Sequence, residues 1–525
     1  MSGNVDAKKS FKYKILFSSS SPLGILSHDV GCNFDGIQPR QDAECIQMEI
    51  GMKFLQNILS TLFCVAAVCA GTSNAQVLVR IDPHVTGKPI PENFLGLSFE
   101  TSATLRGTDG RYPYFNPTNA PLIQLLETLG IKSIRIGGNT SDRPSVPTPT
   151  PADIDEVFSF AQKAKVRLIY TLRLRDSTPS QVQQAAKHIM DRYPDQIDCL
   201  VIGNEPNVYE HTYPKYAEDL KKFYPEVISV APKARFCGPS TTPGSGVWVN
   251  SYIHDFHQLP ELYQVTQHSY PGGNSRKVSD PSTARAAMLS NAFEQEYQKL
   301  YDVFVPTAKS AGVKYRIEET NSYYNGGVRD ASNTFASSLW ALSYMYWWLA
   351  HDAQGINFHT GDQVAAGEVQ TPCWYATFWN TPHDLDIHPI AYALAAFHLA
   401  DHGALVPVQL SSAPDFVEAF ATIAPNGDVY LTLINKSFEA TAKKVDLRVQ
   451  LPQGLVNVDT MTLTAPKAQI AATTGIQLGG ASINSDGHWA GRWTQVSNKQ
   501  SHSTVALTLS PATALIVKMS SAKRN

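Results

Sequence analysis

Eight short apolar runs lie between residues 94 and 360, and stretches with helical character separate most of them. Eight strands that alternate with helices are typical of a closed parallel barrel. An open doubly wound sheet is the alternative, and it usually carries a glycine-rich phosphate turn after its first strand. The segment "LSFETSATLRG" lacks such a turn, which favours a (β/α)8 TIM barrel. The eight predicted strands are 94–100, 133–138, 166–174, 198–205, 235–240, 263–270, 314–320 and 355–360.

The pattern changes at about residue 404. Alternating runs from "LVPVQL" to "TALIVKM" follow, and turn sequences such as "PNGD" and "INSDG" separate them. This pattern predicts an antiparallel β-sandwich over 404–525, after a catalytic barrel over 91–403. Residues 76–90 contain the alternating run "QVLVRIDP". Because this run precedes the barrel and needs a partner, we expect it to join the sandwich.

Residues 52–75 have the order of a secretory signal peptide: a basic residue after Met52, an apolar run, and small residues ending at Ala75. The apolar run is too short to span a bilayer. We therefore expect a secreted or periplasmic protein, cleaved near Ala75. Residues 1–51 show no hydrophobic period, and we interpret them as a non-structured leader ahead of the true start at Met48 or Met52. A genuine N-terminal extension is the alternative.

The charge balance excludes two classes of partner. The 525 residues include 43 basic and 46 acidic side chains, a net charge of -3. This balance predicts neither nucleic-acid binding nor a polybasic membrane patch. After the predicted cleavage, Cys199, Cys237 and Cys373 remain. Three cysteines make no disulfide framework, and their spacing fits no metal site, so we expect buried free thiols.

Three predicted barrel strands end in glutamate, at Glu100, Glu205 and the pair Glu318–Glu319. The carboxyl ends of barrel strands face the active site. Two carboxylates across a cleft, one protonated and one ionised, are what cleavage of a glycosidic bond needs. A salt bridge at a loop is the alternative for any one of them. Glu100 in particular is expected either to bind sugar hydroxyls or to pair with Arg135.

The residues next to these glutamates refine the assignment. Pro206 is expected to hold Glu205 in an extended conformation. Strand alternation places Glu318 on the same side as Arg316, where we expect an ion pair, and leaves Glu319 without a partner. We therefore assign Glu319 to the chemistry and Glu318 to its support.

Two stretches resemble the active-site signatures of glycoside hydrolase family 79, the β-glucuronidase and heparanase-related family. They are "GNEPN" (203–207) and "EETNSYYNGG" (318–327). The Asn-Glu pair is shared across the clan of retaining barrel glycosidases to which that family belongs, whereas the second stretch is more specific. The similarity extends over the mature chain. It implies a secreted retaining β-glucuronidase with β-glucuronide substrates and without a cofactor or a metal.

The resemblance also implies residue roles. Glu205 matches the general acid/base, at the end of the fourth barrel strand, and Glu319 matches the nucleophile, at the end of the seventh. The implied binding residues are Asn204 for the 2-hydroxyl, Tyr270 for orienting the nucleophile, and Tyr324 and Gly326 for the uronate carboxylate.

Further residues are assigned by position. Asn139 is expected to line the floor of the site, and Tyr375 to contact the carboxylate. His268 is expected to be a neutral core histidine. The glycines of "YYNGG" would let backbone amides approach an anion, although an ordinary Asn-Gly turn is the alternative.

Three rival functions stay open: an endo-acting heparanase-like enzyme, a barrel glycosidase for a neutral β-sugar, and a non-catalytic carbohydrate-binding protein. A non-catalytic binding protein would have no need to retain both Glu205 and Glu319. No strong basic cluster lies near the strand-end loops, where "NSRK" (274–277) is the nearest. This favours action on a terminal sugar over cleavage within a sulfated polymer. The sequence predicts no oligomeric state.

Overall fold

The computed structural model describes residues 76–525 except 86, 368, 383, 498–502 and 523–525. The leader and signal peptide predicted over 1–75 lie outside the described residues, so both remain predictions. Within the described ranges, no helix is long and apolar enough to cross a membrane.

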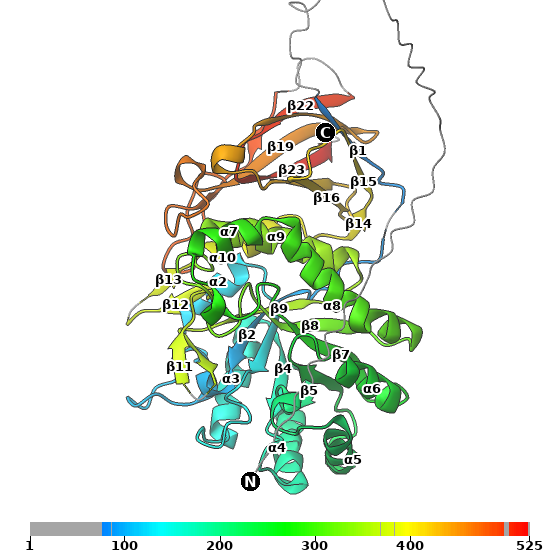
Figure 1. The fold of residues 1–525 in the computed structure, drawn as a ribbon, viewed down its shortest axis with the longest axis vertical. Coiled ribbons are helices and arrows are strands. Elements are labelled where there is room, and N and C mark those ends of the chain that lie inside the picture. The colour runs from blue at the N-terminus through cyan, green and yellow to red at the C-terminus, as the bar shows by residue number, and fades with distance from the viewer. Residues whose placement is uncertain (1–75, 86, 368, 383, 498–502, 523–525) are drawn as a thin grey trace, which may run out of the picture. The chain divides into compact units, whose positions relative to one another are not determined.

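Eight parallel strands close into a barrel, because each pairs with the next and the last returns to the first. The predicted TIM barrel is confirmed, and the doubly wound sheet is excluded (Figure 1). All eight predicted strands form. They are β2 (Leu95–Glu100), β3 (Ser133–Gly137), β4 (Arg167–Leu172), β5 (Ile197–Ile202), β6 (Phe236–Thr241), β7 (Leu262–Ser269), β8 (Tyr315–Thr320) and β9 (Ile356–Thr360).

Helices connect the barrel strands, and their first turns are well specified by the sequence. Thr150 and Thr178 each precede a proline and form a capping box with the third helical residue. The aromatic helix α9 (Phe335–Ala350) packs Trp340 and Tyr344 against Phe358 of β9. The helices are α2 (Ala120–Thr128), α3 (Pro151–Ala164), α4 (Pro179–Arg192), α5 (Tyr213–Val230), α6 (Gly246–Phe256), α7 (Pro281–Met288), α8 (Asn291–Ser310), α9 (Phe335–Ala350) and α10 (Pro389–His398).

Two further sheets form the β-sandwich. One has the order β15-β1-β18-β22, in which β1 is antiparallel to β15 and parallel to β18. The other has the order β14-β16-β17-β23-β19-β20, and β21 also pairs with β19. The strands are β1 (Val77–Ile81), β14 (Ala404–Val406), β15 (Val408–Ser411), β16 (Val417–Ile423), β17 (Val429–Asn435), β18 (Val445–Gln450), β19 (Leu455–Thr464), β20 (Gln477–Leu478), β21 (Thr494–Gln495), β22 (Thr504–Leu509) and β23 (Thr513–Ser521).

The larger sheet packs on both of its faces. In β17, Leu431 and Leu433 face the core between the two sheets, whereas Ile434 belongs to the core of the barrel. Tyr346 of α9 donates to or accepts from Thr432 at 2.8 Å and stacks on Phe420 at 4.7 Å. The barrel and the sandwich therefore share a packed interface.

Two cysteines contradict the expectation of free thiols. Cys199 of β5 and Cys237 of β6 form a disulfide, with Cα atoms 5.8 Å apart. The strands are neighbours in the barrel, but 38 residues of sequence separate the two cysteines. The spacing of the cysteines in the sequence therefore gave no indication of this disulfide. Cys373 is free and buried, as predicted.

Candidate active site

A cavity of about 370 Å³ lies at the carboxyl ends of the barrel strands. Its wall also includes Val364 and Ala365 of β10 (Gln363–Ala366), which follows β9 and forms a hairpin with β11 (Val369–Pro372). A second hairpin, β12 (Phe378–Asn380) with β13 (Leu385–Ile387), comes next in the chain. Seven of the nine predicted site residues line this cavity: Glu100, Asn139, Glu205, Tyr270, Glu319, Tyr324 and Tyr375.

The two predicted catalytic carboxylates meet in this cavity. One oxygen of Glu205 and one of Glu319 lie within 4.8 Å of each other and of a ring nitrogen of His268. His268 Nδ1 lies 2.9 Å from Glu205 Oε1 and 3.7 Å from Glu319 Oε1. Two acidic groups from strands far apart in the sequence thus face one small volume.

Glu319 is held as an anion. Arg135 Nη1 donates to Oε2 at 2.6 Å, and the Tyr270 hydroxyl donates to Oε1 at 2.9 Å. Burial alone would raise the pKa of Glu319. The positive charges of His268, His359 and Arg135, with the Tyr270 hydrogen bond, outweigh burial and hold this pKa well below its usual range. An ionised carboxylate with fixed geometry is suited to nucleophilic attack.

The conformation of β8 near Glu319 departs from strict alternation. The register with β7 shifts between Gln267 and His268, and pairing with β9 passes from Ile317 directly to Thr320. Both Glu318 and Glu319 are buried, while Ile317 packs in the hydrophobic core. Glu319 therefore reaches the cavity through a local irregularity of the strand, a feature that bulged strands often use to re-aim a side chain.

Glu318 does not form the predicted ion pair with Arg316. Its Oε1 accepts a hydrogen bond from Ser240 Oγ and lies 3.8 Å from His268 Nε2. Arg316 instead donates to the side chain of Asn357 and the backbone carbonyl of Asn93, both at 2.7 Å. The ion pair does not form although both residues belong to β8, because residues from other segments lie close enough to hydrogen-bond each group.

Pro206 was expected to hold Glu205 in an extended conformation, but the backbone of Glu205 is not extended. Its φ of 46° and ψ of 49° lie in the left-handed region, which disfavours a non-glycine residue. The Glu205 N–H donates to Ser240 O at 2.8 Å, and the Glu205 carbonyl accepts from Val208 at 2.9 Å. Pro206 then begins the short 3-10 helix η2 (Pro206–Val208). These bonds fix the backbone in a costly conformation of the kind that clusters at functional sites.

Arg135 is the main site residue that sequence reasoning missed. Its guanidinium is fully buried and joins Glu319 to Asn204, whose Oδ1 accepts from Nη2 at 2.6 Å. The expected alternative, a pair between Arg135 and Glu100, does not form. An arginine inside the apolar strand "SIRIGG" was the available signal, because a buried cation needs either an opposite charge or several hydrogen-bond acceptors around it.

His268 is also more than a core histidine. Burial lowers the pKa of His268, but Glu319 and Glu205 outweigh burial and raise it above its usual value. Its ring thus connects the two acids rather than filling space in an apolar core.

Glu100 and Asn139 line the cavity and hold the β10–β11 hairpin. Glu100 Oε1 accepts from the Ala365 N–H at 2.8 Å, and Oε2 accepts from the Thr140 N–H at 2.9 Å. Asn139 Nδ2 donates to Ala365 O at 3.0 Å. Burial would raise the pKa of Glu100, but His359 and these hydrogen bonds lower it.

The residues expected to bind a carboxylate lie on the hairpin side of the cavity. Tyr324 is 39% exposed, and the buried ring of Tyr375 lies 6.1 Å from that of Tyr270. Gly326 is buried outside the cavity lining, with a φ of 87°. A side chain there would meet the carbonyl of Pro372 at 2.7 Å, so this position requires glycine. In the described part of the chain, the Gly326 N–H finds no protein acceptor.

Glu205, His268 and Glu319 form the one acid and histidine group in the described residues whose ligand atoms are close enough for a metal ion. Arg135 already places a positive charge 2.6 Å from Glu319. A second cation there would be opposed electrostatically. The group is better suited to moving a proton.

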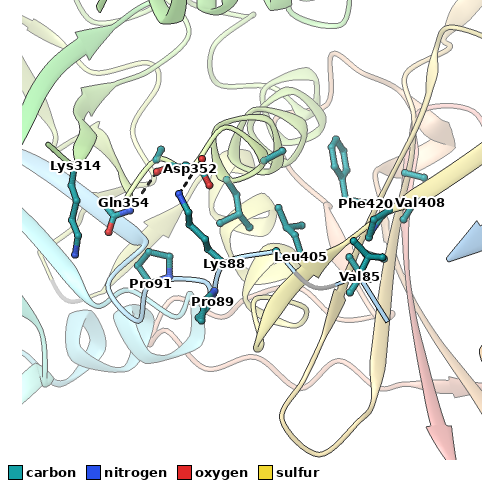
Figure 2. A pocket seen from close by; sticks show the side chains of 18 residues that line it. Val85, Lys88, Pro89, Pro91, Lys314, Asp352, Gln354, Leu405, Val408 and Phe420 are labelled. Atoms are coloured by element: carbon teal, nitrogen blue, oxygen red, sulfur yellow. Dashed lines mark hydrogen bonds and ion pairs between the residues drawn. The ribbon is translucent and has the colours of Figure 1, made fainter. Parts of the chain in front are cut away.

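A larger cavity, about 700 Å³, lies elsewhere, between the barrel and the sandwich (Figure 2). Its wall includes Lys314, directly before β8, and Gln354, two residues before β9, so it lies at the amino end of these strands. Two of its charged groups form an ion pair, because Lys88 lies 3.3 Å from Asp352 (Figure 2). Asp352 also lies 3.1 Å from Lys309, which is outside the lining. Size alone is therefore a poor guide, because this end of a barrel serves stability rather than chemistry.

No family model matches the chain, and no curated protein matches it in sequence. Solved structures do match in fold. A 4-O-α-L-rhamnosyl-β-D-glucuronidase from Fusarium oxysporum superposes with a TM-score of 0.65 at 18% identity, covering 84% of this chain and 99% of the other. A family 51 arabinofuranosidase from Xanthomonas axonopodis gives 0.63 at 16%, covering 85% and 100%. An α-L-arabinofuranosidase from Thermotoga maritima gives 0.61 at 14%, covering 84% and 99%. At these identities the likeness establishes the fold.

Proposed function

We propose that this protein is a retaining β-glucuronidase that removes terminal β-linked glucuronic acid from glycosides or oligosaccharides. The spacing of Glu205 and Glu319 carries the proposal, since one oxygen of each lies within 4.8 Å of the other. Retaining glycosidases hold their carboxyl groups about 5–5.5 Å apart, and inverting enzymes about 6.5–9.5 Å apart, to admit a water molecule. The observed spacing supports double displacement.

The proposed reaction has two steps. Glu319 attacks the anomeric carbon while Glu205 gives its proton to the glycosidic oxygen, so that the carbon–oxygen bond breaks and the alcohol leaves. Glu205 then takes a proton from water, the water oxygen attacks the anomeric carbon, and the Glu319 carboxylate is released. Arg135 and Tyr270, which bind the two oxygens of Glu319, keep it ionised and aimed.

The sugar specificity is proposed from the donors on the hairpin side. The Tyr324 and Tyr375 hydroxyls and the Gly326 N–H are assigned to the uronate carboxylate, and Asn204 Nδ2 to the 2-hydroxyl. The cavity lining contains no lysine or arginine among the described residues. The donors assigned to the carboxylate, Tyr324, Tyr375 and Gly326, are all neutral, and this observation makes a neutral β-sugar the second candidate.

Action on a terminal sugar is favoured by the β10–β11 hairpin. Arg276 Nη2 donates to Ala366 O at 3.0 Å, and Arg143 donates to Gly367 O. Together with Glu100 and Asn139, these contacts hold the hairpin over one side of the cavity. A cavity with one closed side accepts the end of a sugar chain better than the middle of a polymer. Two of the nearby arginines already donate to backbone carbonyls, so they are less available to bind the sulfates of a polymer.

A substrate panel with a pair of variants tests the function. We expect the wild type to hydrolyse 4-nitrophenyl β-glucuronide in preference to the β-glucoside, and glucuronide-capped oligosaccharides in preference to sulfated chains. Glu319→Gln should reduce kcat by about four orders of magnitude, as loss of a catalytic nucleophile does. Glu318→Gln, one residue away, is the matched control and should lose far less. Turnover retained by Glu319→Gln would exclude the assignment, and a preference for glucoside would favour the neutral sugar.

A further inference from the structure

A second cavity, about 310 Å³, adjoins the candidate active site. Pro243 and Tyr270 belong to the walls of both cavities. We call this second cavity the side groove, bounded by Pro243, Tyr270, Pro271, Glu296, Leu300 and Val303. Its volume is at the lower end of the range for small-molecule sites. The proposed chemistry gives no role to it.

The side groove lies where a leaving group would go. An acid that protonates the glycosidic oxygen must stand beside that oxygen, so the aglycone departs next to Glu205. The loop after β6 is the neighbour of Glu205, because the Glu205 N–H donates to Ser240 O at 2.8 Å and Asn207 donates to Thr242 Oγ1 at 2.7 Å. Pro243 follows Thr242 directly and forms the shared wall. A group leaving past Glu205 would therefore pass Pro243, which belongs to the walls of both cavities.

The walls of the side groove are mainly apolar. Pro243, Pro271, Leu300 and Val303 supply hydrocarbon. The only charged residues are Glu296 and Lys299, and they neutralise each other in an ion pair of 2.6 Å. A surface without net charge gives a sulfated or uronic polymer no electrostatic attraction, whereas it stabilises an apolar group by burial.

Exposed apolar side chains gather around this end of the barrel. The described part of the chain exposes seven large apolar side chains, and five of them follow barrel strand ends or border the side groove. The close approach of Gly246 to Val303 brings the start of α6 against α8. Val247 follows Gly246 directly, so the exposed Val247 and Val303 lie on adjoining helices, and adjacent apolar exposure is more typical of a binding surface than a single exposed residue. The five residues are Val208, Val247, Val303, Tyr324 and Val369.

We infer that the side groove binds the aglycone of the substrate and that this aglycone is apolar. The preferred substrates are then glycosides of lipophilic alcohols or phenols, rather than glycosides whose leaving group is a charged sugar polymer. This inference rests on the proposed function, because the position of the aglycone follows from Glu205 as the acid.

Two alkyl substrates test the side groove without changing the chemistry. Methyl and n-octyl β-glucuronide have leaving alcohols of similar acidity, so a difference between them reports binding of the alkyl chain. We expect kcat/KM to be at least about tenfold higher for the octyl glycoside, as extra methylenes in an apolar site provide. Val303→Asp should abolish this preference while leaving methyl glucuronide hydrolysis unchanged. Val456→Asp is the matched control, because Val303 is 36% and Val456 37% exposed, and Val456 lies in β19.

The failures of the two proposals are distinguishable. Hydrolysis of both alkyl glucuronides at equal kcat/KM would overturn the side groove and leave the glucuronidase standing. Absence of any hydrolysis would overturn the glucuronidase. Titration calorimetry of the inert Glu319→Gln variant then decides the side groove, since it measures binding without turnover. About tenfold tighter binding of the octyl than of the methyl glycoside supports the groove, and equal affinity overturns it.

Discussion

Two arginines are almost completely buried in the described part of the barrel, Arg135 and Arg316, and their surroundings differ. Arg135, near the carboxyl ends of the strands, is 0% exposed and donates to the carboxylate of Glu319 at 2.6 Å. Arg316, near the amino ends, is 1% exposed and donates to neutral acceptors, the Asn357 side chain and the Asn93 carbonyl. One arginine thus faces a charge, and the other faces dipoles.

This difference distinguishes the two ends of the barrel by what a buried arginine does there. Burial lowers the pKa of both guanidinium groups. Around Arg135 the charges of Glu319 and Glu318 outweigh burial and raise the pKa, whereas burial dominates at Arg316 and lowers its pKa to about 10. The carboxyl end concentrates opposite charges around Glu319, the proposed nucleophile, while the amino end uses a cation to bind loops together.

Substituting each arginine by methionine should separate the two roles. Arg135→Met removes the cation that keeps Glu319 ionised, so kcat/KM for a β-glucuronide should fall about a hundredfold, as for loss of one charge-stabilising group. Arg316→Met leaves buried acceptors without a donor and should lower the free energy of unfolding by about 3 kcal/mol. Its kcat/KM should stay within a factor of about two, because the site is distant. Steady-state kinetics and urea unfolding measure both, and equal kinetic losses would refute the distinction.

A smaller effect is expected from one hydroxyl at the carboxyl end. Tyr270→Phe removes the 2.9 Å hydrogen bond to Glu319. Because a hydrogen bond to a charged group contributes about 1.5–3 kcal/mol, kcat/KM should fall at least about tenfold. The pKa of Glu319 should rise toward its usual value, which moves the acidic limb of the pH–rate profile upward.

Tyr344→Phe is the control for Tyr270→Phe. The Tyr344 hydroxyl forms a 2.9 Å hydrogen bond with Thr320, which follows Glu319 in β8, and neither residue lines the cavity. This variant should lose stability and keep its pH profile. An unmoved profile in Tyr270→Phe would show that the tyrosine does not act through Glu319.

The sequence predicted the barrel strands well because each is a short apolar run between helices. It also predicted that Glu205 and Glu319 face one site, because both end apolar barrel strands and the barrel brings strand ends together. The choice of Glu319 over Glu318 rested on the resemblance as well, since the Arg316 ion pair predicted for Glu318 does not form.

The contacts between strands were not predictable. The Cys199–Cys237 disulfide, the Arg135 pair and the Ser240 partner of Glu318 all depend on register between strands that are distant in the sequence. The left-handed Glu205 was missed because a preference set by Pro206 was overridden by a bond to Ser240. The register between two distant strands leaves no pattern in either strand's own sequence, so the partners of these residues become visible only in the three-dimensional structure.

The smallest effect should come from His268, through the pH dependence of stability. Its folded pKa is raised above 6.5 by Glu319 and Glu205, so the folded state binds the proton more tightly than the unfolded state. This stabilisation is fully present below pH 6.5 and is lost as the pH rises through the folded pKa. His268→Gln has no such proton, so its melting temperature should fall less than that of the wild type on going from pH 6 to pH 9, by about 2–4 °C. His254→Gln, at a histidine whose side chain is 86% exposed, is the control and should follow the wild type. Parallel melting curves for wild type and His268→Gln would mean that the charge on His268 does not depend on the two carboxylates, and Arg135 and His359 would then remain as the positive charges that act on Glu319.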